Sequence, residues 1–399
     1  MLTSISLFSG AGGLDLGLEN EGFETRAFVE IDRYTASTLQ ENQRFWRRGH
    51  VPVLGDITEL SPFAVMDAAG MTPGKTTVVA GGPPCQSFST AGRRGAISDP
   101  RGSLVIHFAR MVHSIQPRFF VFENVRGILS AAIKHRPLRL RGKATPPLTQ
   151  EEELGSALRR IVLPLLREQL GYEVVYGLIN AADYGVPQTR QRVIFFGSRD
   201  REFNSDRWPF LEMALPRLMP PTHSRHGEEG LPTWRTLRDA VSGLVEREPE
   251  YLPYSQARKE VLDLVPSGRN WRYIRDNHGD ATLRKIMGGA YAADGGKVGF
   301  WRRLDYDKPC PTVPTSPIQK GTSLCHPEVT RPLSVREYSR VQQFPDEYQF
   351  FGSTASKYKQ IGNAVPVGLG SAIGGTILGV LRGHRRVAEE RVAYSATRG

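Results

Sequence analysis

Cysteine is scarce in this chain, which has only three such residues among 399: Cys85, Cys310 and Cys325. They are too few and too far apart for a disulfide scaffold or a zinc knuckle, and the nine histidines show no ligand spacing beside them. We therefore expect no structural metal. We also expect no membrane-spanning segment, because we find no run of about 18 or more apolar residues. We expect a soluble, cytoplasmic protein with no membrane partner.

Acidic residues are outnumbered by basic ones, 41 against 52, which gives a formal charge of +11. This charge suits a polyanionic partner such as nucleic acid without proving one. The clearest basic stretches are Arg93-Arg94, residues 134–143, residues 269–275 and Arg302-Arg303, and any single one of them is more often a solvated face. Since a single core rarely exceeds about 250 to 300 residues, we expect two unequal domains.

The first half of the chain alternates short apolar strands with helical patterns. Strands are predicted at residues 5–8, 26–29, 77–80 and 119–122, and helices at residues 14–20, 34–41 and 104–115. This alternation predicts parallel βαβ units in a doubly wound α/β sheet. A further helix carries one apolar stripe of Leu154, Leu158, Ile161 and Leu165, and strands at residues 173–179 and 193–197 complete the sheet.

The second half is less regular. Residues 129–153 are rich in Lys, Arg and Pro and are typical of an exposed insertion. Residues 200–330 are rich in Pro, Gly, Arg and aromatic residues, and we expect no strong helix before Val335. This segment is the candidate second domain, and helical patterns at residues 335–342 and 369–381 indicate a return to the first.

A glycine-rich turn follows the first strand, in the sequence SLFSGAGGLDLG at residues 6–17. Glycines there allow a sharp turn, and the following helix offers unpaired N–H groups to a ligand. The spacing is not the dinucleotide fingerprint, because position 15 is Asp, and a purely structural turn is the alternative for this motif alone. Glu30 and Asp56 follow the next strands, where carboxylates can accept ribose hydroxyls and an adenine amino group. Together these features indicate a nucleoside pocket.

Two reactive side chains follow the next two strands. Cys85 lies in GGPPCQSFS directly after the strand at 77–80, where the carboxyl ends of parallel strands line a ligand crevice. Its alternative role is that of a small buried hydrophobe, which the stiff prolines before it and the polar residues after it disfavour. The flexible residues 90–95 are a candidate lid. Glu123 ends the strand at 119–122, and its alternative role is that of a surface carboxylate or helix cap.

Several motifs then occur in a fixed order: GGPPCQSFS, ENV, QTRQR, RPLSVREYSRVQQFP and IGNAVPV. With the glycine turn, their order resembles that of the carbon-5 cytosine DNA methyltransferases, over residues 6 to about 369. The closest resemblance is to the bacterial enzymes of restriction-modification systems. It implies that Cys85 is the nucleophile and that Glu123 protonates or hydrogen-bonds ring nitrogen 3 of cytosine. It also implies that Arg192 contacts the carbonyl oxygen of the base and that Arg190 holds nearby backbone.

The same resemblance implies S-adenosylmethionine as the cofactor and a Rossmann-like methyltransferase sheet with a smaller, irregular target-recognition domain. The implied cofactor pocket consists of Phe8, Gly10, Gly12, Gly13, Glu30, Ile31, Asp56, Ile57, Pro84, Asn363 and Val365. The implied domains are residues 1–198 for catalysis and cofactor binding, residues 199–330 for target recognition, and residues 331–399 as a segment returning to the catalytic domain.

The implied partner is double-stranded DNA, from which the target cytosine must be swung out of the base stack. We expect a monomer whose cognate restriction endonuclease is encoded alongside but is not a stable partner. Arginines near Gly288-Gly289 or Arg302-Arg303 are candidates to read guanine edges or to hold phosphates. The alternatives are a tRNA cytosine-5 methyltransferase, which has a shorter middle segment, and a catalytically silent DNA-binding module, which would lack Cys85 or Glu123. A nicotinamide dehydrogenase is disfavoured by the glycine spacing.

Overall fold

The computed structural model describes residues 1–84, 104–134, 136, 147–203, 214–291, 299–319 and 321–396. The chain forms two compact units. The first consists of Met1–Asn180, Gln191–Pro221 and Leu369–Gly399, and the second of Ala181–Arg190 and Thr222–Gly368. Residues 369–399 thus return to the first unit, whereas residues 331–368 pack in the second. The functional division at residues 198 and 330 stays a prediction.

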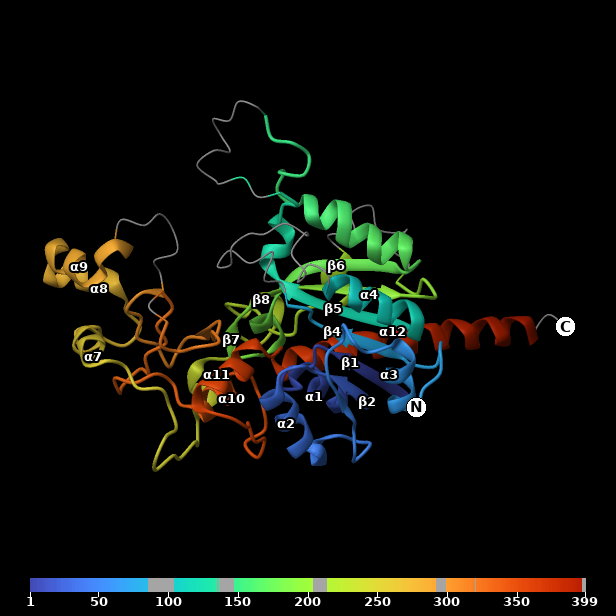
Figure 1. Cartoon of the computed structure of the whole chain (residues 1–399), viewed down its shortest axis with the longest axis horizontal. Coiled ribbons are helices and arrows are strands. Elements are labelled where there is room, and N and C mark those ends of the chain that lie inside the picture. Colours follow the sequence, from blue (N-terminus) through green and yellow to red (C-terminus); the bar gives the residue numbers. More distant parts are fainter. Residues whose placement is uncertain are drawn as a thin grey trace. The chain divides into compact units, whose positions relative to one another are not determined.

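The first unit is built on a seven-stranded sheet, in the order β3-β2-β1-β4-β5-β8-β6 (Figure 1). Its strands are β1 (Leu2–Leu7), β2 (Phe23–Val29), β3 (Val53–Leu54), β4 (Val78–Gly81), β5 (Phe119–Val125), β6 (Glu173–Asn180) and β8 (Gln191–Ser198). The first five are parallel to one another, which confirms the α/β class. Strand β8 is antiparallel to both β5 and β6, so the sheet is mixed, and the parallel units predicted from the first half of the chain are confined to its first five strands. The ten residues Ala181–Arg190 between β6 and β8 contain the short helix Ala181–Tyr184 and the two-residue strand β7 (Gln188–Thr189), and a connection this short suits antiparallel neighbours.

The sheet is buried on both faces, as its unbroken apolar strands require. On one face, Phe120 and Phe122 of β5 pack against Phe108 of α4 (Leu104–Ile115), in the same core as α3 (Pro62–Ala69). The alternate residues Phe119 and Val121 are also fully buried. The remaining helices of this unit are α1 (Gly13–Asn20), α2 (Arg33–Glu41), α5 (Ala214–Leu218) and α12 (Val367–Ala396).

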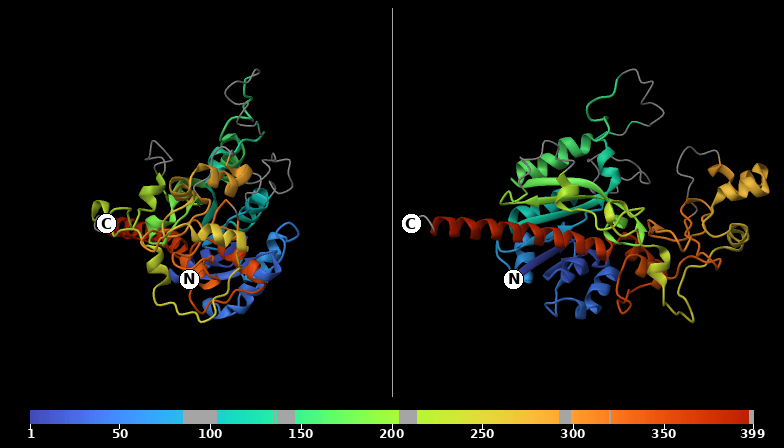
Figure 2. Two further views of the ribbon diagram at one scale, coloured as in Figure 1. Left: turned by 90° about the vertical axis from the view of Figure 1, so that its left-hand side faces the viewer. Right: turned by 180° about the vertical axis from the view of Figure 1, so that it is seen from behind.

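Helix α12 crosses the face of the sheet opposite α4, as the view from behind in Figure 2 shows. It packs tightly on α1, because a Cβ atom added to Gly17 would lie 2.4 Å from the backbone of Gly370. The stretch Thr354–Gly383 is long and apolar enough, by length and composition, to cross a membrane. Our expectation that no such stretch exists was therefore wrong, although the stretch is interrupted by polar residues such as Ser371 and Thr376. The core helices of soluble proteins pass the same test, and 44% of its most apolar window is buried.

The helix predicted from the stripe of leucines begins later and buries a different face. Leu158, Val162 and Leu166 are buried, whereas Leu154 is 53% exposed. The segments Leu158–Val162 and Leu165–Gln169 have π-type hydrogen bonds. The wider turn of a π-helix shifts the buried positions to a spacing of four, which the assumed α-helical period did not reproduce.

The second unit contains several short helices before Val335, a stretch in which we expected no strong helix. They are α6 (Leu237–Val241), α7 (Gln256–Asp263), α8 (Trp271–His278) and α9 (Asp280–Met287). Each has at most eight residues, too few for a clear apolar period, and α8 is started by the side chain of Asn270. A small core of Val265, Ile274, Leu283 and Met287 holds α8 and α9 together. Helices α10 (Val335–Val341) and α11 (Thr354–Asn363) follow, and β7 (Gln188–Thr189) pairs with β9 (Cys310–Pro311).

One of the predicted basic stretches is not a solvated face. Arg303 is only 6% exposed, and its guanidinium donates hydrogen bonds to the carbonyl oxygens of Leu262 and Val265 at 2.7 and 2.6 Å. These bonds tie the end of α7 to the strand-like segment that carries Arg303. Arg303 is therefore a structural residue and does not offer its guanidinium to a guanine edge.

Candidate active site

The strand order places a crevice at the carboxyl ends of β1 and β4. From β1 the chain runs outward through β2 and β3, and it then returns to β4 and β5 on the other side. Ligands of open α/β sheets bind where the order reverses in this way. Residues 8–13 follow β1 and residues 82–84 follow β4, so both predicted motifs border this crevice.

The glycine turn after β1 has a left-handed backbone at Phe8, Gly10 and Gly12, with φ of 54°, 54° and 76°. Phe8 has a Cβ atom, so this conformation costs roughly 1–2 kcal/mol. Gly12 caps the N-terminus of α1, and a Cβ atom added there would lie 2.9 Å from the ring of Trp46. Beside Gly10, by contrast, no atom lies within 4 Å of the corresponding position. Side chains thus fill the space beside Gly12, whereas the space beside Gly10 is free, so a ligand can approach the backbone there.

Glu30 follows β2 and faces this turn. One carboxylate oxygen accepts a hydrogen bond from the backbone N–H of Gly10 and the other from that of Asp32, both at 2.8 Å. Burial raises the pKa of Glu30, although the two N–H donors offset part of that effect. Each carboxylate oxygen can accept a second hydrogen bond, so Glu30 retains acceptor capacity. The adjacent Ile31 is an aliphatic side chain left 69% exposed.

The residues after β3 and β4 extend the same edge of the sheet. Asp56 accepts a hydrogen bond from the backbone N–H of Thr58 at 2.9 Å through one oxygen, and Ile57 is 4% exposed. Pro84 is exposed. Carboxylates at Glu30 and Asp56, the open backbone at Gly10 and the exposed Ile31 fit the ribose hydroxyls, the amino group and the ring of an adenosine. The residues of the first unit therefore fit S-adenosylmethionine.

The two C-terminal members of the predicted cofactor pocket belong to the second unit. Asn363 is exposed at the end of α11, and Val365 lies half-buried just after it. Their role toward the cofactor stays a prediction.

Glu123 and Arg192, which were predicted separately, form an ion pair. Glu123 lies on β5 and Arg192 on the neighbouring β8, and the Nε atom of Arg192 lies 2.7 Å from the Oε1 atom of Glu123. Each side chain is 13% exposed. In such partly buried surroundings a charged hydrogen bond is stronger than in open water. The pair places an acid and a guanidinium side by side at the carboxyl end of β5.

The loop that leads to Cys85 is held against this pair. A Cβ atom added to Gly82 would lie 2.7 Å from the Oε2 atom of Glu123, so only glycine allows this approach. The side-chain amide of Asn124 donates a hydrogen bond to the carbonyl oxygen of Pro83 at 3.3 Å. Cys85 itself lies outside the described residues. We assigned no role to Gly82 or Asn124 from the sequence, although both lie inside the motifs that we quoted.

Arg190 lies in the second unit and is 1% exposed. Its guanidinium donates hydrogen bonds to the carbonyl oxygens of Gly362 and Ala364 at 2.9 and 3.0 Å. The side chain of Gln342 binds the same turn, donating to the carbonyl oxygen of Ile361 at 2.6 Å and accepting from Gln188 at 2.8 Å. This buried network fixes the turn that precedes Val365. The sequence analysis missed Gln342, because no pattern marks a single glutamine at the end of a helix as buried.

The sheet and its ligand edge thus define an α/β fold with a candidate nucleoside pocket beside an acid–guanidinium pair. The family model of the C-5 cytosine-specific DNA methylases matches residues 2–141 and 148–379. The chain belongs to this family, whose members methylate carbon 5 of cytosine in DNA.

Curated relatives match nearly the whole chain. A type II methyltransferase of Staphylococcus aureus, M.Sau96I, is 33% identical over 93% of this chain and 74% of its own length. A type II methyltransferase of Escherichia coli, M.Eco47II, is 34% identical over 95% of this chain and 79% of its own length.

Solved structures share the fold. A DNA modification methyltransferase encoded in an E. coli prophage has a TM-score of 0.61 at 24% identity, covering 96% of this chain and all of that one. A Spodoptera frugiperda DNMT2 variant has a TM-score of 0.52 at 15% identity, covering 95% of this chain and all of that one. At these identities the likeness concerns the fold alone.

Proposed function

We propose that the chain methylates carbon 5 of a flipped cytosine within a specific duplex DNA sequence, with S-adenosylmethionine as methyl donor and Cys85 as nucleophile. The observation that carries this proposal is the Glu123–Arg192 ion pair, against which the loop leading to Cys85 is packed. An acid and a guanidinium there suit a base that must be held by its polar edge while carbon 6 is attacked.

Cys85 starts the reaction by adding its thiolate to carbon 6, which forms a C–S bond and makes carbon 5 nucleophilic as an enamine. After methylation, the hydrogen on carbon 5 leaves as a proton and the C–S bond breaks, which restores the aromatic ring. The other two cysteines support this choice of nucleophile. Burial raises the pKa of Cys310 to about 12 and that of Cys325 to about 11, so neither forms a thiolate readily near neutral pH.

Glu123 protonates or hydrogen-bonds nitrogen 3, where negative charge develops as the thiolate adds. Arg192 holds Glu123 in place and donates to the carbonyl oxygen of the base, as the family resemblance implies. Arg190 has a structural role, because it fixes the turn at residues 362–364 of the second unit. The two arginines of QTRQR thus have separate roles, one toward the base and one toward the backbone.

The cofactor pocket that we propose is formed in the first unit by Phe8, Gly10, Gly12, Gly13, Glu30, Ile31, Asp56, Ile57 and Pro84. The contribution of Asn363 and Val365 from the second unit stays a prediction. When bound, S-adenosylmethionine supplies an electrophilic methyl group. Glu30 accepts the ribose hydroxyls, Asp56 accepts the adenine amino group, and Ile31 covers the ring.

The biological role that we propose is that of the modification enzyme of a type II restriction-modification system, because the curated relatives carry that name. The target sequence is read by the middle segment, at residues 199–330. Swinging the base out of the duplex costs a few kcal/mol, which contacts in the crevice offset. A monomeric state, a cytoplasmic location and a separately acting endonuclease stay predictions.

The test is methylation of duplex DNA of random sequence by the full-length protein with S-adenosylmethionine, followed by bisulfite sequencing. We expect 5-methylcytosine at one short sequence and none with Cys85→Ala. Methylation of transfer RNA without methylation of duplex DNA would contradict the proposal, as would methyl groups on exocyclic amines.

A further inference from the structure

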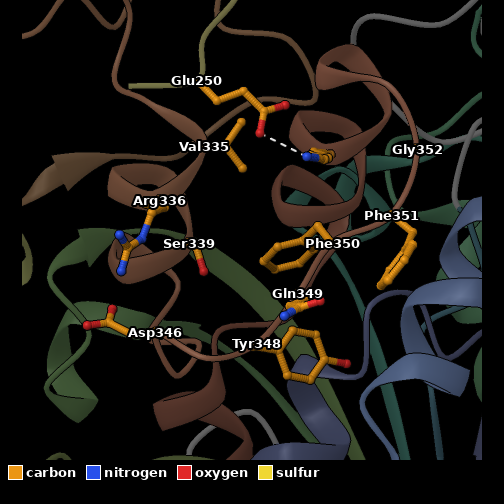
Figure 3. Close-up of a pocket in the computed structure, with 11 residues that line it drawn as sticks. Glu250, Val335, Arg336, Ser339, Asp346, Tyr348, Gln349, Phe350, Phe351 and Gly352 are labelled. Carbon is orange, nitrogen blue, oxygen red and sulfur yellow. Dashed lines mark hydrogen bonds and ion pairs between the residues drawn. The ribbon is translucent and has the colours of Figure 1, made fainter. Parts of the chain in front are cut away.

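The second unit contains an open pocket of about 450 Å³ that no step of the proposed reaction uses (Figure 3). It lies between the start of α10, the loop that follows this helix and the start of α11. Its volume falls within the usual range of small-ligand sites, roughly 300 to 1,000 Å³. All of its lining residues belong to the second unit.

One side of the pocket is aromatic. Tyr348 and Phe350 are 4% and 9% exposed, and their ring centroids lie 5.4 Å apart, so they form a fixed floor. Phe351 is half-buried beside them. Figure 3 shows the three rings grouped on one side, away from Arg336. Of this wall, the half-buried ring of Phe351 offers the apolar surface on which another ring can stack, and the two buried rings support it from below.

The other lining residues include charged side chains, of which Arg336 is the one whose guanidinium is not held by a described neighbour. Lys357 is paired with Glu250 at 2.8 Å, and Asp346 is held by two hydrogen bonds from Arg340 at 2.7 and 2.5 Å. Arg336 is exposed and forms no hydrogen bond or ion pair with any residue that the structure describes. Its charge acts on Asp346, whose pKa is lowered mainly by Arg340 and to a smaller extent by Arg336. The guanidinium of Arg336 is therefore able to donate hydrogen bonds to an anion in the pocket.

We propose that this pocket binds a nucleotide, with the base against the aromatic wall and the phosphate on Arg336. A guanidinium matches the geometry of a phosphate through two parallel N–H donors, and bases stack on aromatic side chains without regard to sequence. The Ser339 hydroxyl lines the pocket between these two sides and can hydrogen-bond a base edge. A free nucleotide and an unpaired nucleotide of a DNA strand share this chemistry. The inference goes beyond methyl transfer and does not require it.

Calorimetric titration of the full-length protein with thymidine 5′-monophosphate tests the proposal. We expect millimolar binding that Arg336→Gln weakens about tenfold or more, whereas the control Arg247→Gln leaves it unchanged. Arg247 is exposed in the same unit and likewise unpaired among the described residues, so the control removes an equal charge outside the pocket. Phe351→Leu keeps the apolar volume but removes the ring, and it should weaken nucleotide binding without affecting inorganic phosphate.

A second arm distinguishes the source of the nucleotide. A single-stranded oligothymidylate that binds through Arg336, while the free nucleotide does not, would assign the site to a DNA strand. The proposal is overturned if neither ligand binds, or if Arg247→Gln weakens binding as much as Arg336→Gln. It is also overturned if Glu30→Ala abolishes binding and Arg336→Gln does not, because the ligand would then occupy the first unit. If inorganic phosphate bound as tightly as the nucleotide, the pocket would be a site for anions in general, and the proposal of a nucleotide site would be refuted.

Discussion

Asp15 should make the stability of the protein depend on pH. It is 1% exposed on α1, directly after the glycine turn, and its pKa is raised from 3.8 to about 7. Burial is the main cause, the nearby Ser6 hydroxyl offsets part of it, and the charge of Glu19 adds to it. One pKa unit corresponds to about 1.4 kcal/mol, so ionised Asp15 costs the folded state about 4 kcal/mol, as an order of magnitude.

The sign follows from proton binding. The unfolded chain loses this proton near pH 4 and the folded chain near pH 7, so the folded state binds more protons between these values. This contribution to the free energy of unfolding is largest below pH 4, falls as pH rises to about 7, and is constant above that. Asp15→Asn removes the ionisable group at nearly constant volume. The variant should therefore match the parent near pH 4 and exceed its stability at pH 8 by up to about 4 kcal/mol.

Urea unfolding followed by circular dichroism at pH 4.5 and pH 8 measures this difference. Asp67→Asn is the matched control, because Asp67 is exposed on α3 of the same unit. The difference in stability between the variant and the parent is free of the contributions of the other carboxylates that titrate in this range, because both proteins contain them. An Asp15→Asn effect of the same size at both pH values would show that Asp15 is not held neutral by burial, and the reasoning would fail.

Three further predictions concern the candidate site. Gly82→Ala should displace the Glu123 carboxylate and lower kcat about tenfold or more. The protein should lose less than roughly 1 kcal/mol of stability, because the Glu123 side chain is flexible and can move. A steady-state assay measures the first effect and a urea titration the second. Glu123→Gln should slow single-turnover methyl transfer about a hundredfold with a smaller change in DNA affinity, because an amide cannot supply the proton; equal rates would assign ring activation to another group. Glu30→Ala should weaken S-adenosylmethionine binding by about 1.5 to 3 kcal/mol, and unchanged calorimetric affinity would place the cofactor elsewhere.

The sequence was sufficient to predict which side chains gather at one edge of the sheet. Parallel strands end at the same edge, so residues that follow β1, β2, β4 and β5 had to lie near one another once the strands were found. The strands themselves were recognisable because they are buried on both faces and therefore nearly all apolar.

Other features could not be predicted, because they depend on contacts between distant segments. The antiparallel direction of β8 follows from its short link to β6, and no residue pattern within β8 encodes it. The Glu123–Arg192 pair depends on that direction, since it brings the start of β8 beside the end of β5. The short helices α7, α8 and α9 are stabilised by a local core that only the folded second unit assembles.

The central claim is that Cys85 bonds covalently to carbon 6 while the methyl group arrives at carbon 5. The most direct measurement uses a duplex in which 5-fluorocytosine replaces the target cytosine. Release requires loss of the substituent on carbon 5 as a cation, which hydrogen allows and fluorine does not. The account predicts one protein bound per site in a complex that survives denaturing electrophoresis, only when S-adenosylmethionine is supplied. Peptide mapping should place the bond on Cys85, and Cys85→Ala should form no complex. An adduct on Cys310 or Cys325, or no adduct at a site that is methylated when it carries ordinary cytosine, would contradict the account.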